Sequence, residues 1–314
     1  MKAAFIKQYG NHSELTVDER PIPVPNANQV LIKVVASGVN PVDFHLRNGM
    51  MAETDTHTLP LILGWDCSGI VEQVGEQVSG FSQGDKVLSF TPIDQQGTNA
   101  EFVTVDATLV SKKPDAMTFI DAAALPLASV TAYQGLHKHG KIRAGQRVLI
   151  HNASGAVGSF AVQIAKAAGA YVVATASQSK QDYVKSLGAD EFHVEGDSEW
   201  ENLGYFDLAF VAKPGAALLD KTVSSVQSGG RLISTFDEIP DAKTSVHGIA
   251  FTRMWVENNK EDLDNVLDLV ASHQLFVPID SVWPLDQIQH AHQRSEQYLA
   301  LGKIVLIVDP LYKR

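Results

Sequence analysis

The chain has 314 residues, and its 25 basic and 36 acidic side chains give a formal net charge of −11. The length suggests about two domains, since single hydrophobic cores stop growing at roughly 250–300 residues, and the lone cysteine, Cys67, excludes an intrachain disulfide framework and a cysteine-rich zinc site. The acidic balance argues against binding to nucleic acid or to an anionic membrane, because both require a positively charged surface.

The N-terminal residues Met1–Lys7 resemble the start of a short strand. They contain neither an apolar signal-peptide stretch nor an arginine-rich leader, so we expect a cytoplasmic protein. The most apolar long window, Met117–Tyr133, is interrupted by Asp121 and Pro126 and is shorter than the ~20 residues of a membrane-spanning helix. We interpret this window as a buried helix at a domain junction and expect no membrane segment.

The first third of the chain consists of short β-rich runs separated by glycine, proline, asparagine and aspartate. This pattern predicts a compact, mostly β domain with irregular loops. The predicted strands are Val30–Val35, Ser68–Val74, Lys86–Phe90 and Ala100–Val105.

After about residue 120, apolar runs alternate with segments of helical periodicity. Such alternation is typical of an α/β fold with a parallel, doubly wound sheet and right-handed crossovers. The predicted strands are Val148–His151, Tyr171–Thr175, Glu191–Val194, Asp207–Val211 and Arg231–Thr235. The helical segments between them are predicted to begin at Val157, Lys180, Ser198 and Ala216.

The last part of the chain returns to a mixed character. It contains a predicted helix, Glu261–His273, the segment Phe276–Trp283, a helix from Asp286 and the strand Lys303–Val308. We interpret this tail as completing the first domain. Residues 1–122 and 258–314 then form one discontinuous domain, and residues 123–257 form the α/β domain inserted into it.

The sharpest motif joins the strand Val148–His151 to a helix through a turn that contains glycines. Gly155 would let the backbone approach a pyrophosphate, and Gly158 would let helix and strand pack closely, with the N–H groups of the helix start facing the phosphates. Ala153 replaces the first glycine of the full dinucleotide motif, so the string alone also fits an ordinary turn. The strand–helix–strand context favours dinucleotide binding by Ser154, Gly155, Ala156, Val157 and Gly158.

The end of the next strand indicates which dinucleotide binds. An NAD site usually places an acidic residue about 20 residues beyond the glycines, where it accepts from the ribose 2′-OH. This strand is instead followed by Ser177 and Lys180, with no acid before Asp182. Ser177 and Lys180 favour a 2′-phosphate, and hence NADPH (NADP+); the alternative is that Lys180 is a solvated lysine in the first turn of a helix.

Four stretches carry a resemblance to a known family. They are Gly38-Val39-Asn40-Pro41-Val42-Asp43, Leu63-Gly64-Trp65-Asp66-Cys67-Ser68-Gly69 with Val74-Gly75 and Gly84-Asp85-Lys86-Val87, Asn152-Ala153-Ser154-Gly155-Ala156-Val157-Gly158 (the glycine turn), and Gly302-Lys303-Ile304-Val305-Leu306. In this order they resemble the medium-chain dehydrogenase/reductase superfamily, specifically its zinc-free quinone oxidoreductase branch related to zeta-crystallin. The resemblance implies a GroES-like, mostly β catalytic domain interrupted by a Rossmann domain, NADPH as cofactor, and reduction of quinones or α,β-unsaturated carbonyls (enones and enals).

The same resemblance bears on metal binding. Zinc-dependent alcohol dehydrogenases of the superfamily have cysteine at the place of Asn40, histidine at the place of Trp65 and a further ligand near Leu127. Catalytic zinc needs three protein donors, and none of these positions supplies one. The histidine pairs His137/His139 and His290/His292 are two residues apart, a spacing that on a helix directs the rings to different sides. We therefore expect no metal site.

The resemblance also assigns catalytic roles. Asn40 would face the cofactor and substrate, Asp43 would organise its loop, and His45 stands where many relatives carry a tyrosine that binds the substrate. His45 either preserves that hydrogen bond or supplies a proton near pH 7, or it merely packs beside Arg47 at the edge of a cleft. We expect Asn40, Asp43 and His45 as the catalytic residues.

Further residues are expected at the cofactor. Thr131 matches a position beside the nicotinamide; alternatively it is a helix residue that bonds its own backbone. Ser234, at the exit of the fifth strand, should border the nicotinamide half of the crevice. Lys303 would reach the cofactor unless it is an ordinary surface lysine. Glu195 stands where NADP(H)-binding relatives often have tyrosine or histidine, and its carboxylate does not favour a 2′-phosphate.

Other functional classes can be tested on the sequence itself. It contains no Tyr-x-x-x-Lys pair, no G-x-S-x-G elbow and no G-x-x-x-x-G-K-[ST] loop, which argues against a short-chain dehydrogenase, a serine hydrolase and a P-loop NTPase. An NADPH-binding redox sensor or structural protein without turnover, and a zinc-dependent alcohol dehydrogenase, remain as alternatives. Lys243–Met254 is interpreted as the last strand of the sheet; because relatives often pair this edge, we expect a homodimer.

Overall fold

The structure is a computed structural model that describes residues 1–197 and 199–311. The described residues divide into two compact units. Unit 1 comprises Met1–Leu127, Asn258–Asp264 and the described residues from Val277 onward, and unit 2 comprises Ala128–Glu257 and Asn265–Phe276. The expected limits of independent domains, residues 1–122 with 258–314 and residues 123–257, remain a prediction. Each unit is described by itself.

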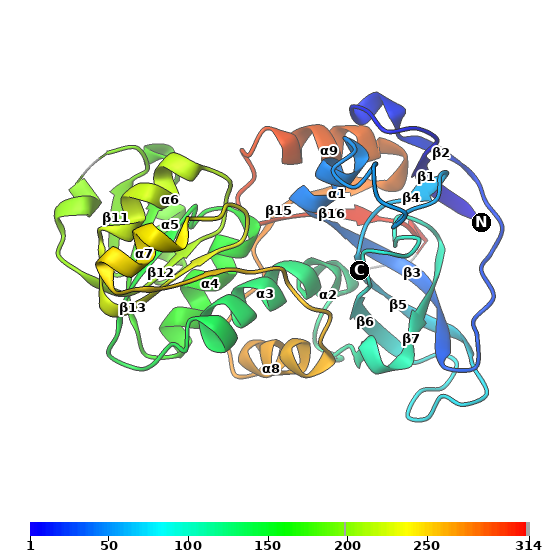
Figure 1. The fold of residues 1–314 in the computed structure, drawn as a ribbon. Coiled ribbons are helices and arrows are strands. Elements are labelled where there is room, and N and C mark those ends of the chain that lie inside the picture. The colour runs from blue at the N-terminus through cyan, green and yellow to red at the C-terminus, as the bar shows by residue number, and fades with distance from the viewer. Residues whose placement is uncertain (198, 312–314) are drawn as a thin grey trace. The chain divides into compact units, whose positions relative to one another are not determined.

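Unit 1 is built mainly on one sheet with the strand order β15-β16-β3-β5-β6-β8, in which β7 also pairs with β3 (Figure 1). Its strands are β3 (Gln29–Val39), β5 (Asp66–Val74), β6 (Lys86–Phe90), β7 (Phe102–Asp106), β8 (Val110–Lys112), β15 (Ile279–Pro284) and β16 (Lys303–Ile307). A smaller sheet has the order β2-β1-β4. Its strands are β1 (Lys2–Ile6), β2 (Thr16–Glu19) and β4 (Leu61–Ile62).

The pairing of β16 with β3 brings the end of the chain to the middle of unit 1. These strands are antiparallel, and Ile304 lies opposite Val39. Lys303 therefore lies beside the residue that follows Val39, although 263 positions separate the two in sequence. The helices of unit 1 are α1 (Pro41–Arg47), α2 (Phe119–Ala124) and α9 (Ile288–Glu296). Ala123 and Ala124 of α2 pack against Ala36 and Val305 in a small buried cluster.

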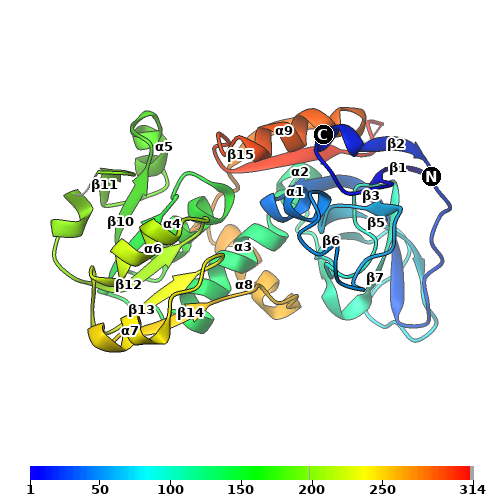
Figure 2. The same cartoon turned by 45° about the horizontal axis from the view of Figure 1, so that its top comes forward.

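Unit 2 contains a parallel sheet with the strand order β11-β10-β9-β12-β13-β14 (Figure 2). Its strands are β9 (Arg147–His151), β10 (Tyr171–Ala176), β11 (Glu191–Val194), β12 (Phe206–Val211), β13 (Val226–Ser234) and β14 (Ala250–Arg253). The chain builds outward from β9 in one direction and then from β12 in the other, so the topological switch point lies between these two strands. The expected α/β fold with a mostly β unit and a doubly wound Rossmann sheet is confirmed.

Helices connect the strands of unit 2. They are α4 (Ala156–Ala167), α5 (Gln181–Ser186), α6 (Ala216–Val223) and α7 (Asp241–His247). Two further helices are α3 (Pro126–Tyr133) and α8 (Lys260–Ala271). In the sequence, the chain passes from unit 1 to unit 2 within each of them. Phe206 and Leu232 of the sheet, Leu219 of α6 and Trp200 belong to one buried apolar cluster, so the sheet and its connections share a core.

The interpretation of Lys243–Met254 as a single strand was wrong in its first half. Residues Asp241–His247 form helix α7, and strand β14 begins only at Ala250. Asp241 stands in the first turn of α7, where a carboxylate interacts favourably with the helix N-terminus. Gly248, with a φ of 65°, ends the helix. Val246 is 83% exposed, so its apolar side chain contributes nothing to the sheet.

The window Met117–Tyr133 was predicted as one buried helix, and the structure contains two, α2 and α3. The break occurs at Pro126, which lacks the N–H of a helix interior and here starts α3 instead. The helix predicted from Ser198 starts at a residue that lies outside the described ranges. The next residues, Glu199–Asn202, form a short 3-10 turn.

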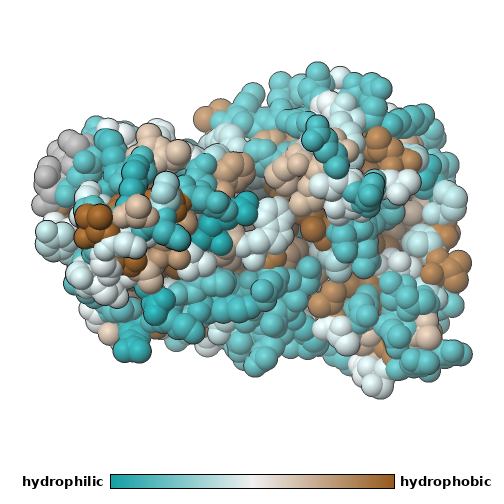
Figure 3. All heavy atoms as spheres, in the orientation of Figure 1, coloured by the Kyte–Doolittle hydropathy of each residue, from teal (hydrophilic) through white to brown (hydrophobic). Residues whose placement is uncertain are grey.

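Among the described residues, no helix is both long and apolar enough to cross a membrane. On the face shown in Figure 3, hydrophilic residues predominate and hydrophobic ones are scattered between them. Scattered surface hydrophobics are ordinary for folded proteins and need no special explanation.

Candidate active site

Asn40 lies at the junction between β3 and α1. Its backbone is extended, with φ −131° and ψ 156°, and Pro41 follows at the first position of the helix. Proline suits this position because its φ is fixed near the helical value and the missing N–H would have no partner there. Asn40 is only 1% exposed. The junction therefore holds the Asn40 amide inside unit 1.

The Asn40 amide lies between a buried cation and a buried anion. Lys303 Nζ donates to Asn40 Oδ1 at 2.6 Å and to Asp66 Oδ2 at 2.9 Å, and Asn40 Nδ2 donates to Asp66 Oδ2 at 2.8 Å. Neither charged side chain has any exposed surface. A flipped amide would place Nδ2 against the ammonium and Oδ1 against the carboxylate, so the two charges fix its orientation.

Lys303 is thus not the surface lysine that the sequence left as an alternative, and its contact with a cofactor stays a prediction. Sequence reasoning missed its partner Asp66, whose other carboxylate oxygen accepts from the Leu127 N–H at 2.6 Å. The available signal was the pattern itself. A lysine and an aspartate that each begin an apolar strand need a partner when buried.

Gly38 makes room for this network. A Cβ at this position would lie 2.8 Å from Asp66 Oδ2 and 2.5 Å from the Ala123 carbonyl oxygen, closer than real Cβ atoms come. The glycine of the Gly38–Asp43 motif therefore has a steric reason in this chain: it allows the Asp66 carboxylate and helix α2 to approach β3.

Asp43 lies in the first turn of α1 and is completely buried. Its Oδ2 accepts from the Asn40 backbone N–H at 3.0 Å, while Oδ1 is buried with no hydrogen-bond partner among the described residues. Burial raises the pKa of Asp43 to about 8, although the Asn40 hydrogen bond and the charge of Lys303 both act to lower it. The carboxyl group is therefore mainly protonated at neutral pH, and its hydrogen bond holds the Asn40 backbone at the start of α1.

His45 lies on α1 next to Phe44, with their ring centroids 4.3 Å apart. Its side chain is partly buried, and burial lowers its pKa. Burial therefore disfavours the protonated imidazole, and the role of His45 at the substrate stays a prediction. Tyr298 packs edge-on against Phe44, at 5.9 Å between ring centroids.

Arg47 is completely buried. Its guanidinium donates to the Gly10 carbonyl oxygen, contacts His292 Nδ1 at 3.0 Å and pairs with Glu296. Burial, together with the Arg47 charge, lowers the pKa of His292 to about 3, so that His292 is neutral and its Nδ1 accepts from Arg47. These contacts attach the end of α1 to α9 and thereby steady the helix that begins at Asn40.

The glycine turn of unit 2 connects β9 to α4. Asn152 has a left-handed φ of 54°, and its Nδ2 donates to the Ala212 carbonyl oxygen at 3.1 Å. A Cβ on Gly158 would lie 2.1 Å from the Asn152 carbonyl oxygen. The prediction that Gly158 permits close packing of helix and strand is therefore confirmed. Gly155 precedes the first residue of α4, which leaves the N–H groups of the helix start directed at the carboxyl edge of the sheet.

His151, the last residue of β9, lies next to this turn in the sequence and is buried. Its Nδ1 lies 2.8 Å from Thr175 Oγ1 and its Nε2 lies 3.1 Å from Thr222 Oγ1. Thr222 Oγ1 donates to the Leu218 carbonyl oxygen, so it accepts from His151 Nε2 and Thr175 donates to Nδ1. Burial lowers the pKa of His151 to about 3. A neutral histidine thus links β9, β10 and α6.

The predicted cofactor residues in unit 2 lie at strand ends or on a neighbouring helix. Ser154 is buried in the turn, while Ser177 follows β10 and is exposed. Lys180 is the last residue of a 3-10 turn, and its backbone N–H donates to the Ser177 carbonyl oxygen at 2.9 Å. Ser234 ends β13, and Thr131 is buried in α3. Because the strands are parallel, Ser154, Ser177 and Ser234 share one edge of the sheet, which fits a dinucleotide.

Sequence reasoning missed one charged partner at this edge. Glu195 accepts from Lys213 Nζ at 2.8 Å. Lys213 follows β12 by two residues, in a segment that carries no recognisable motif.

The three positions that the resemblance aligned with zinc ligands hold other groups in this structure. The Asn40 amide is bonded to Lys303 and Asp66, Trp65 is fully buried, and Leu127 contributes its backbone N–H. Throughout residues 1–197 and 199–311, no group of three or more His, Cys, Asp or Glu side chains is arranged to hold a metal ion.

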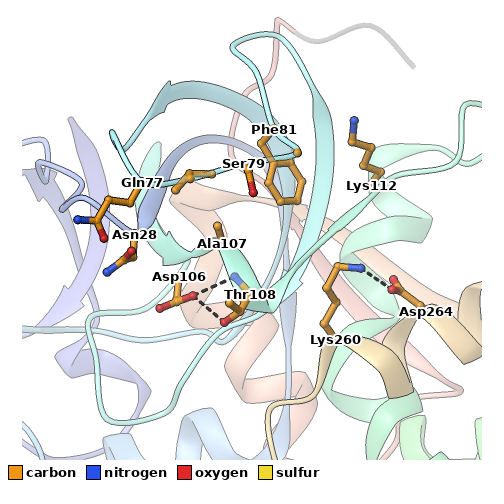
Figure 4. Close-up of a pocket in the computed structure, with 12 residues that line it drawn as sticks. Asn28, Gln77, Ser79, Phe81, Asp106, Ala107, Thr108, Lys112, Lys260 and Asp264 are labelled. Atoms are coloured by element: carbon orange, nitrogen blue, oxygen red, sulfur yellow. Dashed lines mark hydrogen bonds and ion pairs between the residues drawn. The ribbon is translucent and has the colours of Figure 1, made fainter.

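An open pocket of about 690 Å³ lies elsewhere in unit 1 (Figure 4). Phe81 and Lys112 line one side of it, and the ion-paired Lys260 and Asp264, at the start of α8, line another. None of the residues predicted for the active site lines this pocket, and the sequence contained no signal for it.

Comparison with known proteins identifies the class. Residues 26–115 match the family description "Alcohol dehydrogenase GroES-like domain", and residues 187–306 match "Zinc-binding dehydrogenase". The buried network at the start of α1 and the doubly wound sheet with its glycine turn lie within or between these regions. The chain belongs to the medium-chain dehydrogenase/reductase superfamily, in its quinone oxidoreductase family, and it is an oxidoreductase.

Individual relatives extend this assignment. The chain is 34% identical to a 2-methylene-furan-3-one reductase of Solanum lycopersicum, over 98% of this chain and 79% of the relative. It is 32% identical to an NADPH-dependent alkenal/one oxidoreductase, chloroplastic, of Arabidopsis thaliana, over 99% and 80%. The solved quinone oxidoreductase of Coxiella burnetii superposes with a TM-score of 0.89 at 29% identity, covering 98% of this chain and 99% of the other.

Proposed function

We propose that this protein transfers hydride from NADPH to quinones or to α,β-unsaturated carbonyl compounds (enones and enals). The observation that carries the proposal is the Asn40 amide, held in one orientation by Lys303 and Asp66. An amide with fixed orientation is suited to binding a carbonyl oxygen. The relatives named as reductases of a furanone, of alkenals and enones, and of quinones support this substrate class.

The cofactor site is proposed in unit 2. Ser154, Gly155, Ala156, Val157 and Gly158 would receive the pyrophosphate at the start of α4, where N–H groups and the helix dipole favour an anion. Ser177 and Lys180 would receive the 2′-phosphate, and Thr131 and Ser234 would border the nicotinamide. When bound, NADPH supplies the hydride; the chain's residues supply binding and orientation.

The substrate chemistry is proposed for α1. Asn40 Nδ2 donates one hydrogen to Asp66, and its second hydrogen would donate to the substrate oxygen as negative charge develops there. Lys303 and Asp66 act as positioning residues that orient this amide. Asp43 holds the Asn40 backbone, and the neutral His45 would donate a hydrogen bond to the substrate. Water would supply the proton that completes the reduction.

The reaction is proposed to need no metal. The donor set at the start of α1 supports this, because Asn40 Oδ1 already accepts from an ammonium group and neither Trp65 nor Leu127 carries a metal ligand. We expect activity to survive exhaustive chelation, with no stoichiometric zinc by elemental analysis. An inactive apo form that zinc restores would instead support an alcohol dehydrogenase.

The direct test follows NADPH absorbance during incubation with a panel of quinones and enones. Oxidation of NADPH above the buffer rate, strongly reduced in Asn40→Ala, is the expected result. Tight NADPH binding with no acceptor reduced would favour the competing function, a redox sensor or structural protein that binds NADPH without turnover. The panel also reveals whether quinones or enones are preferred.

A homodimer and a cytoplasmic location complete the proposal. Strand β14 is the last strand of its sheet, and an edge strand presents backbone groups that a second copy can pair with. Light scattering at micromolar concentration tests the dimer, and a monomer mass would refute it. Fluorescence imaging of the tagged chain tests the location, which the chloroplastic relative makes worth examining.

A further inference from the structure

The ion pair of Glu195 and Lys213 extends along the carboxyl edge of the unit 2 sheet. Glu195 directly follows β11, and Lys213 follows β12. Lys213 Nζ lies 2.8 Å from Glu195 Oε1, and the side chains are 30% and 25% exposed. Because β10 and β9 separate β11 from β12 in the sheet, the pair reaches across the carboxyl ends of both inner strands.

Two hydrogen bonds and one charge interaction place this pair beside the residues proposed to bind the cofactor. The Glu195 N–H donates to the Ala176 carbonyl oxygen at 2.8 Å, so Glu195 lies next to Ser177. Asn152 of the glycine turn donates to the carbonyl oxygen of Ala212, the residue before Lys213. The Lys213 charge also contributes to the lowered pKa of His151, at the end of β9. A sheet of this strand order binds the adenosine half of a dinucleotide at this edge.

A carboxylate at this position conflicts with the proposed cofactor. The 2′-phosphate of NADPH carries negative charge and would lie beside Ser177, where an unpaired Glu195 would repel it. NADH has a neutral hydroxyl at the same point and would not be repelled. The observed ammonium contact removes the conflict, because Lys213 cancels the charge of Glu195 at hydrogen-bond distance.

We propose that Lys213 is a cofactor-selectivity residue, which neutralises Glu195 and so lets the chain accept the 2′-phosphate of NADPH beside Ser177. The inference rests on the proposed function. It adds a residue after the fourth strand of the sheet to the selectivity set, and it explains how a glutamate is tolerated where a phosphate binds.

The test compares Kd values of NADPH and NADH, measured by coenzyme fluorescence, for three variants of the full-length chain. Lys213→Met should weaken NADPH by about tenfold and NADH by less than about twofold, because it leaves Glu195 negative. Glu195→Gln should leave NADPH binding unchanged or tighter. Lys213→Met combined with Glu195→Gln should restore NADPH binding to within about threefold of wild type, since both charges are gone.

The control is Lys221→Met. Lys221 pairs with Glu201 at 2.9 Å, but it lies near the end of α6, which runs from the carboxyl edge of the sheet back toward the opposite edge. Its removal should leave the ratio of the two Kd values unchanged.

Two results would overturn the inference while the proposed function stands: an equal effect of Lys213→Met on both coenzymes, or a double variant as weak for NADPH as Lys213→Met alone. The latter would mean that Lys213 contacts the phosphate itself. A wild-type chain that binds neither coenzyme would overturn the inference and the proposed function together, a result distinguishable from the other two in the first titration.

Discussion

The two units hold their key lysines in opposite ways. In unit 1, Lys303 has no exposed surface and contacts both Asn40 and Asp66. In unit 2, Lys213 is 30% exposed and contacts Glu195. A buried charge must be paired, because desolvation would otherwise cost several kcal/mol, whereas a partly exposed pair contributes at most about 1 kcal/mol and is screened by salt.

This difference suggests that the Lys303 network matters mainly for the stability of the fold, and the Lys213 pair mainly for the choice between NADPH and NADH. The Lys303 network cannot rearrange without leaving a buried charge unpaired. It therefore holds Asn40 in a fixed geometry. The Lys213 pair is partly exposed, so it can respond to a ligand at little cost, in keeping with the selectivity role proposed for it. The following predictions test this division.

Replacement of Lys303 is expected to have the largest effect on stability. Lys303→Met would leave Asp66 buried without its cation and should lower the free energy of unfolding by roughly 3–5 kcal/mol. Urea denaturation measures this loss. Lys33→Met is the matched control, because Lys33 is 45% exposed in its pair with Asp309, and it should cost less than about 1 kcal/mol.

If Lys303→Met fails to fold, Lys303→Met with Asp66→Asn should recover part of the loss, since no buried charge remains. A single variant that loses no more stability than Lys33→Met would contradict the contrast between the units.

Asn40→Ala should affect the reaction more than the fold. It keeps the contact between Lys303 and Asp66 but removes the amide, so kcat should fall by about 100-fold, as when a donor to a developing oxyanion is removed. The Kd of NADPH should change by less than about threefold if unit 2 alone supplies that affinity. Asn28→Ala, at the exposed pocket of unit 1, is the control and should leave kcat unchanged.

The raised pKa of Asp43 should make the free energy of unfolding depend on pH. Its pKa is raised from 3.8 to about 8 in the folded chain, so folding favours the protonated carboxyl. This contribution is fully present below pH 3.8 and is lost as the pH rises to about 8. The stability of wild type relative to Asp43→Asn should therefore fall between pH 5 and pH 8 and level off above. Denaturant midpoints across this range measure it; a flat difference would contradict the protonated state.

Much of the fold follows from sequence periodicity. The strands Lys86–Phe90 and Glu191–Val194 were predicted with their observed limits, because turn residues bound them tightly. Lys243–Met254 was misread because Val246, Ile249 and Phe251 also fit a strand pattern. The helix there depends on an N-terminal Asp241 and on Gly248 in a left-handed conformation, both of which are weak signals in a single sequence.

The site was predictable only where local motifs define it. The close packing at Gly158 followed from the strand–turn–helix motif. The partners of Asn40 did not, because Asp66 and Lys303 come from distant strands and meet through the pairing of β16 with β3 and of β3 with β5. The role of Lys213 could not be predicted from the sequence either, because its contact with Glu195 depends on the order of strands in the sheet.

The smallest expected effect concerns Lys180, and it sharpens the contrast within unit 2. Lys180 belongs to the turn that follows Ser177, so Lys180→Ala should remove part of the attraction for a 2′-phosphate and raise the Kd of NADPH about three- to tenfold. NADH binding should change by less than about twofold. Lys185→Ala, on the same strand-to-strand connection at the end of α5, is the matched control.

Salt separates the two lysines. If Lys180 attracts the phosphate directly, the difference between wild type and Lys180→Ala should shrink as ionic strength rises, because salt screens an attraction that reaches out to the exposed Ser177. Lys213→Met should keep more of its effect, since the repulsion by Glu195 acts from a partly buried position at close range. Equal losses of NADPH and NADH affinity in Lys180→Ala would remove Lys180 from the phosphate site and leave Ser177 and the neutralised Glu195 as the basis of selectivity.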